Sequence, residues 1–158
     1  MHPRPSSWCG RTGIRPGEHK LVVVDASVAL KWVVTEAGSD EASALLTDMV
    51  NDAVSLVAPE HLVGEVGNGL RKRVAQGVLI ADDAVVALDA VAALELELVS
   101  GQERWLRSLR AALDWGVTTY DALYVLLALD LDAELITADL RLAESALNKS
   151  LPVRPLIA

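Results

Sequence analysis

Short apolar runs alternate with longer segments of helical periodicity along most of the chain. Residues 21–24 form a continuous apolar run rich in β-branched residues, which is typical of a strand buried on both faces. The same criteria predict strands at 55–58, 96–99 and 134–137, and helices at 27–34, 38–51, 60–76, 82–94, 102–115, 119–130 and directly after Asp139. Two prolines in residues 152–157 predict a last strand at a sheet edge, where proline is tolerated. The alternation predicts an α/β fold with a central, mainly parallel sheet flanked by helices.

The first 19 residues do not follow this pattern. They hold three of the six prolines, show little periodicity and lack the apolar stretch of a signal peptide. We therefore expect residues 1–19 to be a disordered N-terminal extension and residues 20–158 to form one domain, as the length of 158 residues suggests.

The charge of the chain argues against general affinity for nucleic acids. The formal net charge is −8, and phosphate contacts supply most non-specific binding to RNA or DNA. This objection weakens if part of the negative charge is gathered at a site that a divalent cation neutralises. A single cysteine excludes an intrachain disulfide and fits a cytoplasmic protein, and no apolar run approaches the roughly 20 residues of a membrane span.

Two aspartates lie where α/β sheets bind ligands, beyond the carboxyl ends of the strands. Asp25 follows the first predicted strand, and Asp139 comes just after the strand that ends at Thr137. Asp121 opens an almost wholly apolar helix, and Glu65 lies within a largely apolar one. Taken singly, each acid also has a structural explanation, as a helix cap, a capping box or a solvated side chain.

Four short motifs that contain these acids resemble the successive motifs of the PIN-domain nucleases, in order and spacing. They are Val24-Asp25-Ala26-Ser27, Glu65-x-x-Asn68-x-Leu70, Tyr120-Asp121-Ala122-Leu123-Tyr124 and Thr137-Ala138-Asp139-Leu140-Arg141-Leu142. Within that family the resemblance is nearest to the VapC toxins of bacterial toxin–antitoxin pairs. It implies a PIN fold, an Mg²⁺- or Mn²⁺-dependent endoribonuclease acting on RNA, a homodimer and inhibition by a VapB-type antitoxin.

The resemblance also assigns the site. The family's acidic residues fall on Asp25, Glu65, Asp121 and Asp139, and its polar neighbours on Ser27, Asn68 and Thr137. Without a cation, two carboxylates about 5 Å apart repel by about 3 kcal/mol at an effective dielectric of 20. Four acids that converge at one end of the sheet are therefore explained by a hard cation, which prefers oxygen ligands.

We expect Asp25 and Asp139 to bind the metal directly or through water, with Asp121 beside them. Glu65 either binds a metal or orients the attacking water. Ser27 and Thr137 are expected to hold the ligands by hydrogen bonds.

Weaker signals have two interpretations each. His61 and Glu65 are four residues apart on one helix, which suits a pair that chelates a metal. The other interpretation, a solvent-facing histidine, is the more common arrangement and is the one we expect. The basic residues at 71–73 and at Arg104, Arg107 and Arg110 either guide phosphate or form a solvated face. The glycines at 64, 67 and 69 indicate either close packing or room for a ligand beside Glu65. Trp32, Trp105 and Trp115 are interpreted as core or interface residues, and Tyr124 as a neighbour of the site.

Other phosphate-processing domains fit less well. A receiver-type domain needs a further Asp after a central strand, but Ser100 and Gly101 follow 96–99. A haloacid-dehalogenase phosphotransferase needs Asp-x-Asp, and position 27 is Ser. A catalytically silent PIN-like module that binds RNA or an antitoxin remains the alternative to the enzyme.

Overall fold

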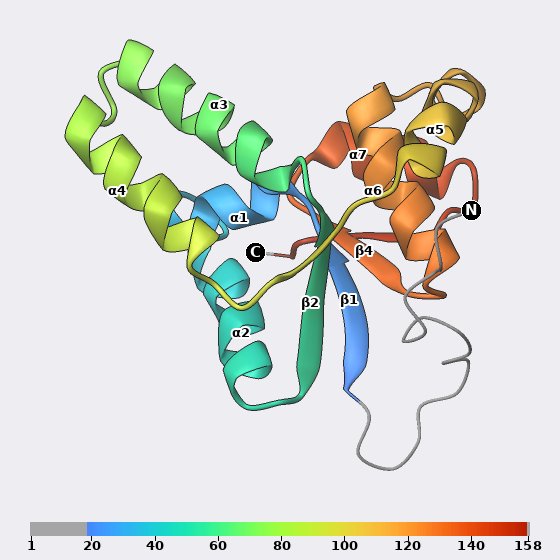
Figure 1. Ribbon diagram of the computed structural model, residues 1–158, viewed down its shortest axis with the longest axis horizontal. Helices are drawn as coiled ribbons and strands as arrows, with labels where there is room; N and C mark the ends of the chain where they lie inside the picture. The colour runs from blue at the N-terminus through green and yellow to red at the C-terminus, as the bar shows by residue number, and fades with distance from the viewer. Residues whose placement is uncertain (1–18, 158) are drawn as a thin grey trace, which may run out of the picture.

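The computed structural model describes residues 19–157, in which five parallel strands form one sheet of order β3-β2-β1-β4-β5 (Figure 1). The strands are β1 (Lys20–Val24), β2 (Val54–Pro59), β3 (Glu97–Val99), β4 (Glu134–Thr137) and β5 (Val153–Pro155). The chain builds outward from β1 through β2 to β3 and then returns to the other side of β1, where Val24 pairs with Ile136 of β4. The order of the strands thus reverses between β1 and β4, which is where such sheets bind ligands.

Seven helices surround this sheet in the described part of the chain. They are α1 (Ala26–Val33), α2 (Ser39–Val50), α3 (Leu62–Ala75), α4 (Ala81–Ala92), α5 (Gln102–Trp115), α6 (Thr119–Asp130) and α7 (Leu140–Leu147). Figure 1 shows α3 and α4 side by side as a projecting hairpin on one side of the molecule, with α5, α6 and α7 on the other side. The ends of β1 and β4 lie between these two groups of helices.

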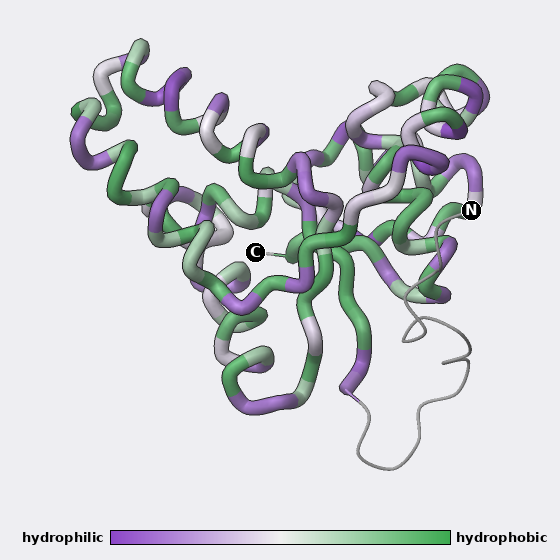
Figure 2. The backbone as a smooth tube through the Cα atoms, in the orientation of Figure 1, coloured by the Kyte–Doolittle hydropathy of each residue, from purple (hydrophilic) through white to green (hydrophobic). Residues whose placement is uncertain are grey.

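The core lies around β1, β2 and α6. Val23 and Val24 are fully buried, and residues 56–58 are almost fully buried. Figure 2 shows the hydrophobic colour along the central strands. Helix α6 is buried at every position from 122 to 128 because it packs against β1, β2 and β4. Apart from Tyr124 this run is aliphatic and has no polar face, so the few polar side chains in or near it must find partners inside the protein.

The predicted elements are confirmed, and all of the strand pairings are parallel. Strand β5 pairs only with β4, so it is the predicted edge strand. Of the predicted N-terminal extension, residues 1–18 lie outside the described residues. Within residues 19–157, no helix has the length and apolarity needed to cross a bilayer.

The glycines of α3 differ from one another in their surroundings. A Cβ atom at Gly69 would lie 2.6 Å from Leu30 Cδ1, so this glycine allows α3 to approach α1 closely. A Cβ atom at Gly67 would touch Leu88 of α4 at 3.4 Å, whereas one at Gly64 would meet nothing within 4 Å. Close packing therefore explains Gly69, and open space lies beside Gly64, next to Glu65.

Candidate active site

Asp25 joins the end of β1 to the start of α1. Its backbone is extended (φ −102°, ψ 176°) and its carboxylate caps the helix, since Oδ1 accepts hydrogen bonds from the amides of Ser27 at 3.1 Å and Val28 at 3.2 Å. Only 5% of the residue is exposed. The cap explains its placement, but a cap has no need of such deep burial.

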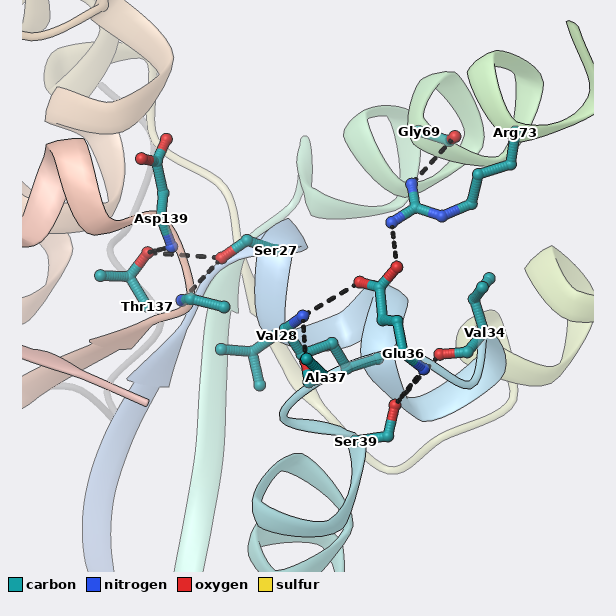
Figure 3. A network of polar contacts seen from close by, with 12 residues as sticks. Ser27, Val28, Val34, Glu36, Ala37, Ser39, Gly69, Arg73, Thr137 and Asp139 are labelled. Carbon is teal, nitrogen blue, oxygen red and sulfur yellow. Dashed lines mark hydrogen bonds and ion pairs between the residues drawn. The ribbon is translucent and has the colours of Figure 1, made fainter. Parts of the chain in front are cut away.

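Two hydroxyl groups connect Asp25 to the end of β4. Thr137 donates a hydrogen bond to Asp25 Oδ2, and Ser27 donates one to Asp25 Oδ1. The Ser27 hydroxyl also accepts from the amide of Ala138 at 2.8 Å, and Thr137 Oγ1 accepts from the amide of Asp139 at 3.0 Å (Figure 3). These bonds fix the carboxyl ends of β1 and β4 against each other.

Asp139 lies directly beyond this network, where it caps α7. Its Oδ1 accepts from the amides of Arg141 at 2.9 Å and Leu142 at 3.4 Å. About a third of the side chain is exposed (32%), and the nearby Arg141 guanidinium, 3.7 Å from Oδ1, is almost fully in solvent (93% exposed). Asp139 therefore presents its carboxylate to solvent at the edge where Asp25 is buried.

Asp121 and Glu65 come from the first turns of α6 and α3. The Thr118 hydroxyl caps α6 by accepting from the Asp121 amide at 3.0 Å. Glu65 accepts a hydrogen bond from the hydroxyl of Tyr124, which lies one turn after Asp121, at 2.6 Å. This bond links α3 to α6 across 59 positions of sequence.

Asp25, Asp121 and Asp139 each act to raise the pKa of another acid of this set. Burial raises the pKa of Asp25 to about 6 despite its hydroxyl and amide donors, and the charge of Asp121 adds to the shift. Burial also raises the pKa values of Glu65 and Asp121. The charges of Asp121 and Asp25 raise that of Glu65 further, and the charge of Asp139 raises that of Asp121.

The oxygen donors fit a hard divalent cation, though not as a closed cage. Among residues 19–157, no three His, Cys, Asp or Glu side chains are grouped closely enough to hold a metal ion by themselves. Mg²⁺ usually keeps several of its waters and binds through only one or two carboxylates. The arrangement therefore suits a partly hydrated ion bound by a few of the four acids better than a fully dehydrated one.

Asn68 is not brought into this network. Its residue is exposed, and its side-chain oxygen accepts from Arg71 Nε at 3.1 Å on the surface of α3. Tyr124, in contrast, is only 1% exposed and reaches Glu65 directly, so it belongs to the site more closely than its sequence position alone indicated. The signal for Tyr124 was its place one turn after Asp121 in an otherwise aliphatic helix.

The expectation of a solvent-facing His61 is wrong. Its side chain is 12% exposed and packs against the rings of Tyr124, Trp105 and Tyr120, with centroids 4.8, 5.5 and 5.7 Å away. Its Nε2 atom lies 3.8 Å from Glu65 Oε2 and has no hydrogen-bond partner among the described residues. Burial lowers the pKa of this imidazole, because the charged form would lose its hydration.

Most of the arginines singled out in the sequence are paired with acids. Arg104 and Arg107 bind Asp130, and Arg110 binds Asp114. Arg73 donates to Glu36 at 2.8 Å. Because these arginines are already paired with acids, they are better explained as parts of solvated helix faces than as residues that bind RNA phosphates. Of the three tryptophans considered above, Trp32 and Trp115 pack against the core, while Trp105 is 39% exposed beside His61.

Comparison with a family model and with known sequences indicates the PIN-domain family in both cases. Residues 22–147 match the family model described as PIN domain. The chain is 36% identical over 121 residues to Ribonuclease VapC1 of Mycobacterium tuberculosis, covering 77% of this chain and 87% of that protein. It is 34% identical over 125 residues to Ribonuclease VapC3 of Pyrobaculum aerophilum, covering 78% of this chain and 92% of that protein.

Solved structures share the fold. The crystal structure of PAE2754 from Pyrobaculum aerophilum superposes with a TM-score of 0.65 at 21% identity, covering 87% of this chain and 90% of that one. VapBC2 from Rickettsia felis, bound to a DNA fragment from its promoter, contains a chain that superposes with a TM-score of 0.61 at 11% identity. That match covers 85% of this chain and 98% of the other.

Proposed function

The chain belongs to the PIN-domain family, and from this premise we propose that it is a divalent-metal-dependent endoribonuclease, the toxin of a VapBC-type toxin–antitoxin pair. The VapC1 and VapC3 relatives, both named ribonucleases, support the activity. The observation that carries the proposal is that Asp25 and Asp139 lie at the carboxyl ends of β1 and β4, joined by the hydroxyl groups of Ser27 and Thr137, while burial and the charges of neighbouring acids raise the pKa values of Asp25, Glu65 and Asp121.

Buried acids that raise one another's pKa values favour the binding of a cation from solution. The hydrogen-bond donors around Asp25 are hydroxyl and amide groups, and the arginine nearest Asp139 is almost wholly solvated. Negative charge that the fold concentrates without neutralising it is costly, and a bound Mg²⁺ or Mn²⁺ would remove that cost. The same ion would offset the repulsion between an acidic chain and RNA phosphates.

The proposed roles follow the exposure of the acids. Asp25, held rigidly by Ser27 and Thr137, and Asp139, open to solvent, would bind the ion directly or through water, with Asp121 beside them. Glu65 would bind the ion or orient the attacking water. A bound divalent ion supplies activation of water and stabilisation of charge on the phosphate oxygens. The protein would hold the acids in place, and the bound ion would favour their ionised form.

The partners are also part of the proposal. The resemblance implies a homodimer and a VapB-type antitoxin in the cytoplasm. The exposed apolar side chains support protein partners, since such side chains are costly to leave in water. Seven of them lie on the α3–α4 hairpin (Val78, Ile80, Val85, Val86) and along α5 (Leu106, Leu109, Leu113). Size-exclusion chromatography with light scattering, with and without the antitoxin, tests both associations.

The central test is cleavage of a mixed RNA pool by the purified protein with EDTA, Mg²⁺ or Mn²⁺. Metal-dependent endonucleolytic products support the proposal. RNA that stays intact under every condition, while the protein is folded and binds antitoxin, would instead establish the silent binding module.

A further inference from the structure

Tyr124 is a buried polar residue to which the mechanism above gives no role. Its residue is 1% exposed in an aliphatic stretch of α6, where a hydroxyl without a partner would be costly. Phenylalanine would fill the same volume without that cost, yet the chain contains no Phe and one of its two tyrosines lies here. The hydroxyl therefore needs an explanation from its partner.

That partner is one oxygen of Glu65. The Tyr124 hydroxyl donates to Glu65 Oε2 at 2.6 Å, a distance typical of a strong bond to a carboxylate. The His61 ring lies on the same side, with Nε2 3.8 Å from Oε2 and its centroid 4.8 Å from that of Tyr124. Oε2 is thus covered by two aromatic side chains, and Oε1 is the oxygen left for other contacts.

The bond also fixes a side chain that its own helix does not hold. Glu65 lies in the first turn of α3, where Gly64 precedes it with open space around its Cα. A glutamate in such a place has three rotatable bonds and could take many rotamers. A bond from a residue buried in α6 reduces these to the ones that reach Tyr124.

We propose that Tyr124 is a positioning residue that holds Glu65 by its Oε2 atom and leaves Oε1 available to the cation, directly or through a water bound to it. The inference deepens the proposed function and rests on it. Removing such a supporting partner of a metal ligand typically costs about 10–100-fold in metal affinity or activity.

The test compares Tyr124→Phe with Tyr120→Phe. Tyr120 is the other tyrosine, lies one turn earlier on α6, is half exposed, and its hydroxyl has no hydrogen bond within residues 19–157. Both variants lose one hydroxyl and nothing else. Mn²⁺ binding to the protein without RNA is measured by calorimetry, and kcat and KM are measured on a fluorogenic RNA.

We expect Tyr124→Phe to weaken Mn²⁺ binding by about tenfold and to lower kcat by about 10–100-fold, with little change in KM. Tyr120→Phe should keep wild-type values. Glu65→Asp leaves α6 unchanged but shortens the side chain so that it no longer reaches both Tyr124 and the cation. It should therefore lose as much as Tyr124→Phe, and it tests the inference even if Tyr124→Phe folds poorly.

Wild-type Mn²⁺ affinity in Tyr124→Phe, wild-type kcat in Glu65→Asp, or an equal loss in Tyr120→Phe would overturn the inference. A wild-type protein that binds Mn²⁺ in a Tyr124-dependent manner but cleaves no RNA would refute the proposed function instead. The two failures are therefore distinguishable.

Discussion

The two ends of α1 each carry a carboxylate, and the two carboxylates have opposite surroundings. Asp25 precedes the helix and accepts hydrogen bonds from hydroxyl and amide groups. Glu36 follows the helix and accepts from Lys31 Nζ at 3.0 Å and Arg73 Nη2 at 2.8 Å, in the second network of Figure 3. Glu36 is therefore paired with the positive charges of Lys31 and Arg73, whereas the hydrogen-bond donors of Asp25 are uncharged.

The pKa values differ accordingly. Burial raises the pKa of Asp25 to about 6, and the charge of Asp121 adds to it. Burial also acts to raise the pKa of Glu36, but the hydrogen bonds and charges of Arg73 and Lys31 outweigh it and the pKa is lowered. The charge of Glu36 is thus balanced by Lys31 and Arg73, and its bond with Arg73 joins α3 to the segment after α1. Asp25 is the acid that we propose to bind a cation from solution.

Loss of the proposed cation site should have the largest effect. Asp25→Asn and Asp139→Asn keep a good helix cap but remove the charge, so the fold should survive. Several kcal/mol of charge stabilisation would be lost, which lowers kcat/KM by about a thousandfold. Asp114→Asn, at an exposed pair with Arg110, is the control and should cleave normally. Wild-type rates in the purified Asp25 or Asp139 variants would remove these residues from the site.

The second prediction concerns stability without metal. A carboxyl whose pKa is about 6 in the folded state and 3.8 in the unfolded state stabilises the fold at low pH. This contribution is lost as the pH rises through 4 to 6, by about 3 kcal/mol in total. In EDTA, the unfolding free energy should therefore increase between pH 7.5 and 5 in the wild type and less so in Asp25→Asn. Parallel pH profiles, measured by urea denaturation, would contradict the burial argument.

The sequence predicted the elements and the positions of Asp25 and Asp139 at the carboxyl ends of β1 and β4. Strand 21–24 is a continuous apolar run, and the topology rule places Asp25 and Asp139 at the carboxyl ends of the strands. These predictions depend on local pattern and chain order, which the sequence contains directly. The role expected of Ser27 and Thr137 came instead from the resemblance to the PIN-domain nucleases, and both lie within two residues of these aspartates.

The remaining features depend on which helices pack together. His61 is buried because α5 and α6 bring Trp105 and Tyr120 over it, and no periodicity within α3 contains that information. Gly69 is explained by Leu30 of another helix. Glu36 lies between α1 and α2 without a motif, and its importance comes from Arg73, 37 positions away.

Two serines allow the comparison to be made with the same substitution. Ser27 bridges Asp25 and Ala138, and Ser39 serves the Glu36 segment by accepting from the Glu36 amide at 3.0 Å and donating to the Val34 carbonyl. Ser27→Ala should lower kcat by about 10–100-fold because Asp25 loses a supporting donor. Ser39→Ala should leave kcat unchanged. Single-turnover cleavage at saturating Mg²⁺ measures both, and equal rates in the two variants would show that the networks do not differ in function.

The smallest expected effect is at Glu36 itself. Its ion pairs are partly exposed (30% for Glu36, 15% for Lys31 and 20% for Arg73), so Glu36→Gln should lower the unfolding free energy by about 1 kcal/mol at pH 7. Because the folded-state pKa of Glu36 is lowered from 4.5, its contribution is present above that pH and is lost as the pH falls, opposite in sign to that of Asp25. Urea denaturation at pH 7 and pH 4 should therefore show a difference between Glu36→Gln and wild type that shrinks in acid. A cleavage defect in Glu36→Gln, with stability unchanged, would reverse the assignment of the two ends of α1.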